Sequence, residues 1–124
     1  MDSKTAKRNR RNGHGYERDI AKDYREAGFV DTITSRLGSL LHDSAKIDLT
    51  RLPFFPQCKY GYKSFSVNSY IELFNDMEEG IKTNKIPEDF PKIIHHRKGR
   101  KKNQDLVIIP RQDFFKLIKQ IQND

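Results

Sequence analysis

Three segments of the chain carry apolar residues at the three- and four-residue spacing of an amphipathic helix. The first ends before Gly28, a residue type that commonly stops a helix. The second begins at Ser69, which forms a capping-box pattern with Glu72, and the third follows Pro110. The pattern therefore predicts three helices. Their apolar positions are Tyr16, Ile20, Ala21, Tyr24 and Ala27; then Tyr70, Leu73, Phe74, Met77 and Ile81; then Phe114, Phe115, Ile118 and Ile121.

Five other segments read as strands, because they are rich in β-branched or aromatic residues or alternate between apolar and polar positions. They span residues 29–35, 44–49, 54–60, 92–97 and 105–109. Together with the helices they give the order α-β-β-β-α-β-β-α. This order favours a single α/β domain in which helices flank a mixed central sheet.

The composition of the 124 residues fits one domain with a modest core. Lys and Arg number 24 against 17 Asp and Glu, a net charge of +7, which suits a polyanionic partner such as nucleic acid. A solvated basic surface that binds nothing would have the same composition. The single cysteine excludes an intramolecular disulfide and favours a reducing, cytoplasmic setting. No apolar run approaches the ~20 residues of a membrane span, so no membrane partner is expected.

Basic residues concentrate in two places. Residues 1–12 have almost nothing apolar to bury and are predicted to form a flexible basic arm before a domain at 13–124. Residues 97–102 lie between two predicted strands and indicate a hairpin with a basic tip. Both clusters could instead be solvated and bind nothing. The candidate DNA contacts are Arg8, Arg10 and Arg11 in the arm, and Arg97, Lys98, Arg100, Lys101 and Lys102 in the hairpin.

A candidate metal site is indicated by four polar residues. Gln57 and Lys59 share one face of a predicted strand, since alternate strand residues point the same way. Asp48 precedes them on a strand that could pair with theirs, and Glu17 lies on the apolar stripe of the first helix, where a carboxylate needs a partner. Two carboxylates and an amide oxygen suit a divalent cation such as Mg²⁺. Asp43 is a second choice of ligand.

Simpler interpretations of these residues stay open. Glu17 could serve only the helix dipole, and Gln57 and Lys59 could be an ordinary solvent-facing pair. The adjacent His95 and His96 suggest a zinc site only weakly, because neighbours on a strand face opposite ways. Cys58 is predicted to be a buried side chain rather than a nucleophile.

The sequence resembles the PD-(D/E)XK nuclease superfamily, in which a helix Glu and a strand Asp precede a (D/E)-x-K strand. Within it, the likeness is to small Holliday junction resolvases of the archaeal and phage type. The matching stretches are GHGYERDIAKDYREAGF, SRLGSLLHDSAKIDL and FFPQCKY, the last in a Q-x-K form. The likeness covers residues 13–60, and it implies the restriction-endonuclease-like fold of that superfamily.

The resemblance also implies roles. Glu17, Asp48 and Gln57 would hold Mg²⁺, with Mn²⁺ as a substitute, and Lys59 would stabilise charge during phosphodiester hydrolysis. Arg18 and Arg36 would contact phosphate. The substrate would be branched DNA, and the active form a homodimer, encoded by a cell, a phage or a mobile element. The sequence departs from the pattern in Gln57, which carries no charge, so a non-catalytic nucleic-acid-binding module and a restriction- or nicking-type nuclease are the alternatives.

Overall fold

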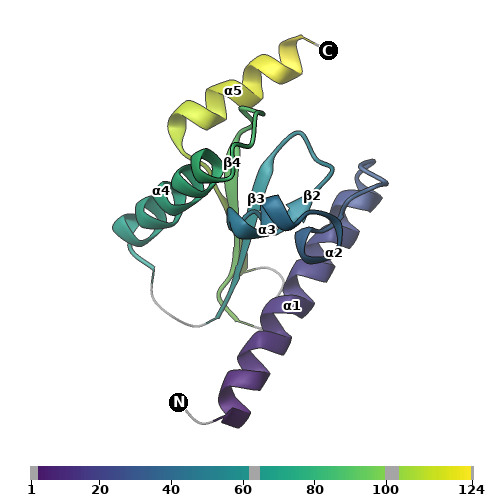
Figure 1. Ribbon diagram of the computed structural model, residues 1–124, viewed down its shortest axis with the longest axis vertical. Helices are drawn as coiled ribbons and strands as arrows, with labels where there is room; N and C mark the ends of the chain where they lie inside the picture. Colours follow the sequence, from purple (N-terminus) through teal and green to yellow (C-terminus); the bar gives the residue numbers. More distant parts are fainter. Residues whose placement is uncertain (1–2, 62–64, 100–103, 124) are drawn as a thin grey trace.

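The computed structural model describes residues 3–61, 65–99 and 104–123. Helices and strands are interspersed along the chain, as expected for an α/β protein (Figure 1). The elements are α1 (Ser3–Glu26), β1 (Ile33–Thr34), α2 (Ser35–Gly38), α3 (Leu40–Ser44), β2 (Leu49–Thr50), β3 (Phe55–Tyr60), α4 (Val67–Thr83), β4 (Lys92–Arg97), β5 (Asp105–Ile108) and α5 (Arg111–Gln122).

The strands form two sheets among the described residues. The larger sheet is mixed: β3 pairs parallel with β4, and β4 pairs antiparallel with β5. The smaller sheet is the antiparallel pair β1–β2. The prediction of an α/β protein with a mixed sheet and flanking helices is therefore confirmed. A continuous five-stranded sheet is not seen.

The first two predicted strands are shorter than expected because the chain between them coils. Residues 35–44 form α2 and α3, which are too short to show helical periodicity in the sequence. Lys46 and Arg51 have φ of 62° and 66°, a left-handed conformation that interrupts extended backbone on both sides of β2. The predicted strand 44–49 is thereby reduced to the two residues of β2 and the segment leading to it.

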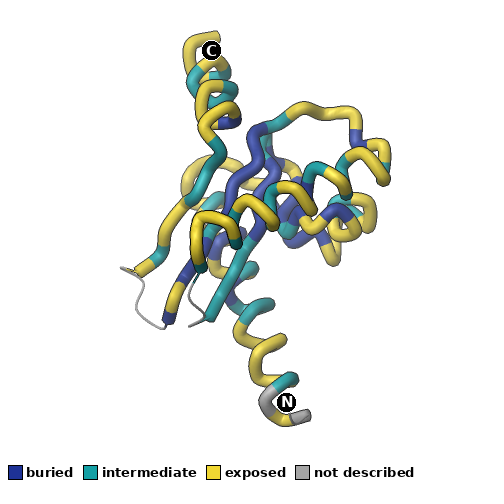
Figure 2. Tube along the Cα trace, turned by 90° about the vertical axis from the view of Figure 1, so that its left-hand side faces the viewer, coloured by how far each residue is buried: buried dark blue, intermediate teal, exposed yellow. Residues whose placement is uncertain are grey.

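Helices cover both faces of the larger sheet (Figure 1). On one face, the predicted stripe of α1 packs against β2 and β3, with Tyr16, Ile20 and Leu49 in a buried cluster. On the other face, Met77 of α4 packs with Ile47 and with other buried residues. Figure 2 shows this buried centre along the strands, with most of the helical surface exposed. No helix in the described ranges is both long and apolar enough to span a membrane.

Two helix starts differ from the sequence prediction. Helix α1 begins at Ser3, so residues 3–12, predicted to be a flexible arm, are the first turns of a continuous helix. These turns carry no apolar stripe, and they extend beyond the sheet (Figures 1 and 2). Helix α4 is capped by Ser66 in a capping box with Ser69, one turn before the predicted Ser69–Glu72 box.

Candidate functional site

Asp48 lies where the two sheets meet, beside the free edge of β3. Its backbone N–H donates to the carbonyl of Pro56 over 2.8 Å, and its own carbonyl accepts the N–H of Ser35 over 2.8 Å. Its carboxylate Oδ2 accepts the N–H of Cys58 over 2.7 Å. The carboxylate thus satisfies a strand N–H that a neighbouring strand would otherwise satisfy. Asp48 is fixed to β3 by both its backbone and its side chain.

This arrangement also explains the proline inside β3. Strand residues alternate in the side to which their N–H and C=O groups point. Phe55 donates its N–H toward the β4 side, to the carbonyl of Pro91, whereas the carbonyl of Pro56 faces Asp48. The N–H that Pro56 lacks would therefore have pointed away from β4, so the proline removes no bond from the β3–β4 ladder.

The charges of three other predicted residues act on the Asp48 carboxyl. Its removal from water raises the pKa of Asp48 to about 7, and the Cys58 N–H opposes this rise. The negative charges of Glu17 and Asp43 also raise this pKa, while the positive charge of Lys59 lowers it. The fold therefore brings Glu17, Asp48 and Lys59 into one electrostatic neighbourhood, although they are far apart in the sequence.

Gln57 lies one residue before Cys58 on β3 and is buried, with 3% of its surface exposed. Its side-chain Oε1 has no hydrogen-bond partner among the described residues. A buried polar atom without a partner costs roughly 1–3 kcal/mol, so this oxygen is available to accept a bond from a ligand. By strand alternation Gln57 and Lys59 share one face. Cys58, which was predicted to be buried, is partly buried against the α1 cluster on the other face.

Glu17 is paired rather than free. The Nε atom of Arg36, on α2, lies 3.4 Å from the Oε2 atom of Glu17. Arg36 was predicted to contact phosphate, and in this structure it instead balances the charge of the helix carboxylate. Arg18, the next residue on α1, is exposed.

The donor set fits a hard divalent cation. Glu17 and Asp48 offer carboxylate oxygens, and Gln57 offers the unpartnered Oε1. Mg²⁺ commonly takes one or two carboxylates and keeps several waters, so the oxygen types of these three side chains suit it. No group of three or more His, Cys, Asp or Glu side chains in the described ranges has a metal-site arrangement. Gln57 is not among those residue types. Asp43, exposed on α3, remains the second choice of ligand.

The predicted DNA contacts fall into three groups. Arg8, Arg10 and Arg11 are exposed on α1, and Lys98 is exposed after β4. Arg97 is buried, in contrast, and it binds both carboxylate oxygens of Asp105. It also lies 4.8 Å over the Tyr16 ring, so its guanidinium is committed to holding β5 and α1 together. Arg100, Lys101 and Lys102 lie outside the described residues.

The two histidines of β4 face opposite sides of the sheet, as predicted. His95 is hydrogen-bonded to Tyr24 of α1 over 2.6 Å, and His96 to Tyr70 of α4 over 2.7 Å. His96 is the register partner of Lys59 in the parallel ladder, and the Lys59 charge helps lower the pKa of His96, after the larger effect of burial. Sequence reasoning missed this neighbour of Lys59, because only the strand register brings the two residues together.

Comparisons of the chain with protein-family models, with curated proteins and with solved structures found no match. The case for a function therefore rests on the residues of the site and on their geometry.

Proposed function

We propose that this protein is a metal-dependent, structure-selective DNA endonuclease that hydrolyses phosphodiester bonds in branched DNA such as a four-way junction. The observation that carries the proposal is the environment of Asp48. A desolvated carboxylate held by the Cys58 N–H is subject to the charges of Glu17 and Lys59. An unpartnered amide oxygen lies on the adjacent Gln57. Carboxylate and amide oxygens can hold a hard cation, and an ammonium group can stabilise the negative charge that develops during phosphodiester hydrolysis.

Each residue has a distinct role in this proposal. Glu17, Asp48 and Gln57 would hold Mg²⁺, which when bound would supply Lewis-acid stabilisation and lower the pKa of water. Lys59 contributes a fixed positive charge beside Asp48, where negative charge develops on the phosphate. Arg18 orients the phosphate, and Arg36 does so once the phosphate competes with Glu17 for its guanidinium. A homodimer would present two such sites to the two strands of a junction.

One observation favours a second candidate, a non-catalytic nucleic-acid-binding module on the same fold. Gln57 adds no negative charge to the site, and Arg36 already neutralises Glu17. Such a site would attract a cation less strongly than one with three carboxylates. The protein would then bind DNA through its basic surface without cutting it.

A cleavage assay separates the two candidates. The purified protein is incubated with an end-labelled four-way junction or with linear duplex of the same sequence, across a titration of Mg²⁺ and then of Mn²⁺. Asp48→Asn serves as the matched control, because it preserves shape and an oxygen acceptor for the Cys58 N–H. We expect Mg²⁺-dependent cleavage of the junction, weaker cleavage of the duplex, and none by the variant.

Cleavage that favours linear duplex would instead indicate a restriction- or nicking-type nuclease. Tight binding with no cleavage by the wild type would establish the non-catalytic alternative.

A further inference from the structure

From Ser3 to Arg18, five cations of α1 lie along one side of the helix: Lys4, Lys7, Arg8, Arg11 and Arg18. At about 100° of rotation per residue, their side chains fall within roughly 100° of the helix circumference. The core-facing residues of α1 lie on the opposite side. We refer to these five residues as the cationic stripe. Arg10, adjacent in sequence to Arg11, points about 100° away from it and lies outside the stripe.

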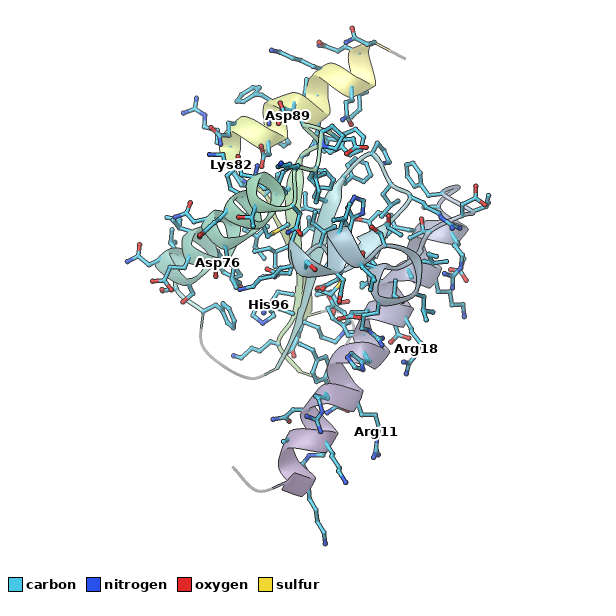
Figure 3. The ribbon with its side chains drawn as sticks, in the orientation of Figure 1. Arg11, Arg18, Asp76, Lys82, Asp89 and His96 are labelled. Carbon is cyan, nitrogen blue, oxygen red and sulfur yellow. The ribbon has the colours of Figure 1, made fainter. Side chains whose placement is uncertain are left out.

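The charge of the cationic stripe is not neutralised by the residues that the structure describes. All five side chains are exposed, and none forms an ion pair within the described part of the chain. The stretch 3–16 contains no Asp or Glu. In Figure 3, Arg11 and Arg18 project from α1 on the side away from the sheet. A concentrated, unpaired row of cations is complementary to a polyanion.

The cationic stripe begins at the candidate site and leads away from it. Arg18 directly follows Glu17, and Lys4 is fourteen residues earlier on the same helix. At 1.5 Å per residue the stripe is about 21 Å long, which corresponds to about six base-pair steps of 3.4 Å along duplex DNA. Its outer part belongs to the turns of α1 that project beyond the sheet (Figures 1 and 2).

We propose that α1 is a rigid binding surface for one duplex arm of the substrate, on which the cationic stripe contacts backbone phosphates up to about six base pairs from the candidate site. The proposal rests on the proposed function for its choice of DNA as partner. It adds that the cations keep fixed angular positions around the helix relative to the candidate site. The cations of a flexible basic arm would not. An anionic membrane is disfavoured because residues 3–14 include only one apolar residue, Ala6, and an interfacial helix needs an apolar face.

Insertions of alanine after Asn12 test whether binding depends on the angular position of the outer cations around the helix. Two alanines rotate the outer four cations by about 200° relative to Arg18, whereas four alanines rotate them by only about 40°. Affinity for a fluorescent four-way junction is measured without divalent metal, so that cleavage plays no part. We expect the two-residue insertion to weaken binding about tenfold and to lower the log–log salt slope by about 3 to 4, because four phosphate contacts are lost. The four-residue insertion should stay within about threefold of wild type.

A pair of single substitutions provides the matched control. Arg11→Ala removes a cation from the stripe, and Arg10→Ala removes an exposed cation of the same type one residue away. We expect only the first to lower the salt slope by about one. Helix content by circular dichroism and the melting temperature establish that all four variants fold. Equal losses for the two insertions, or for the two substitutions, would overturn the proposal, as would equal binding of wild type to anionic phospholipid vesicles.

These results are independent of the catalytic proposal. If the two-alanine insertion weakens binding more than the four-alanine insertion but wild type cuts no DNA with Mg²⁺, the rigid surface stands and the nuclease proposal fails. If wild type cuts the junction but the insertions behave alike, the nuclease stands and the rigid surface is wrong.

Discussion

The backbone N–H of Cys58 donates a 2.7 Å hydrogen bond to the side-chain carboxylate of Asp48, ten residues earlier in the chain. This bond places an acid at the edge of β3, on the strand that carries Gln57 and Lys59. The N–H favours the charged form of Asp48, but it does not offset the loss of water, so the pKa of the carboxyl is raised to about 7. A bound cation would favour the ionised form further, which links metal binding directly to this residue.

Substitution of the two central charges should separate cutting from binding. We expect Asp48→Ala to abolish Mg²⁺-dependent cleavage, and Lys59→Ala to slow it by about 10²–10³-fold, the usual effect of removing one charge-stabilising group. DNA affinity should change little, because binding rests on the cationic stripe of α1. Single-turnover cleavage and filter binding measure the two properties. Wild-type cleavage by either variant would mean that β3 is not the catalytic strand.

The unpartnered oxygen of Gln57 gives a second prediction. Gln57→Glu keeps an oxygen at this position and adds a negative charge, so it should stay active and need no more Mg²⁺ than wild type. Gln57→Leu keeps the approximate volume but removes the oxygen, so cleavage should fall sharply while the melting temperature is maintained or rises. The Mg²⁺ dependence of cleavage for the three proteins is the measurement. Full activity of Gln57→Leu would exclude Gln57 from the site.

The sequence predicted the layers of the fold better than its strand lengths. The spacing of Tyr16, Ile20 and Ala21 identified the buried stripe of α1, because a helix of this length must bury one face. The lengths of the strands before β3 could not be predicted, because the positive φ angles of Lys46 and Arg51 occur at residues other than glycine. The helical form of residues 3–12 was missed because apolar periodicity reports packing against a core, and these turns extend beyond the sheet.

The sequence indicated which residues make up the candidate site, but not the contacts that those residues make. Strand alternation placed Gln57 and Lys59 on one face without any structure. The pairing of Glu17 with Arg36, and the burial of Arg97 against Asp105, depend on contacts between elements that no local pattern encodes. Two of the predicted phosphate contacts, Arg36 and Arg97, thus lie in ion pairs within the protein.

Histidine 95 provides a prediction about stability and pH. Burial lowers the pKa of His95 to about 4, from an ordinary value of 6.5. Between these pH values the unfolded chain binds a proton at His95 that the folded protein does not. The contribution of His95 to the free energy of unfolding is therefore fully present above about pH 6.5 and is lost as the pH falls toward 4. The loss amounts to about 3 kcal/mol. His95→Phe should be less stable at pH 7, through loss of the Tyr24 bond, but should show a flatter decline.

Urea unfolding of both proteins at pH 7, 6, 5 and 4 measures this difference. The carboxylates titrate alike in the two proteins, so subtraction of one curve from the other isolates the histidine. A constant difference across the range would show that His95 does not resist protonation in the folded state.

Two helical glycines should respond in opposite directions to the same substitution. A Cβ atom added at Gly13 of α1 would meet no atom within 4 Å, so Gly13→Ala should raise the free energy of unfolding by about 0.5–1 kcal/mol through helix propensity alone.

A Cβ atom at Gly80 of α4 would lie 2.7 Å from the backbone Cα of Ala45. That contact is impossible without separating α4 from the segment that leads to Asp48. Gly80→Ala should therefore be destabilising despite the same gain in propensity, by about 1–3 kcal/mol. Chemical denaturation gives both values. A stabilised Gly80→Ala protein would mean that α4 does not pack against Ala45 as described.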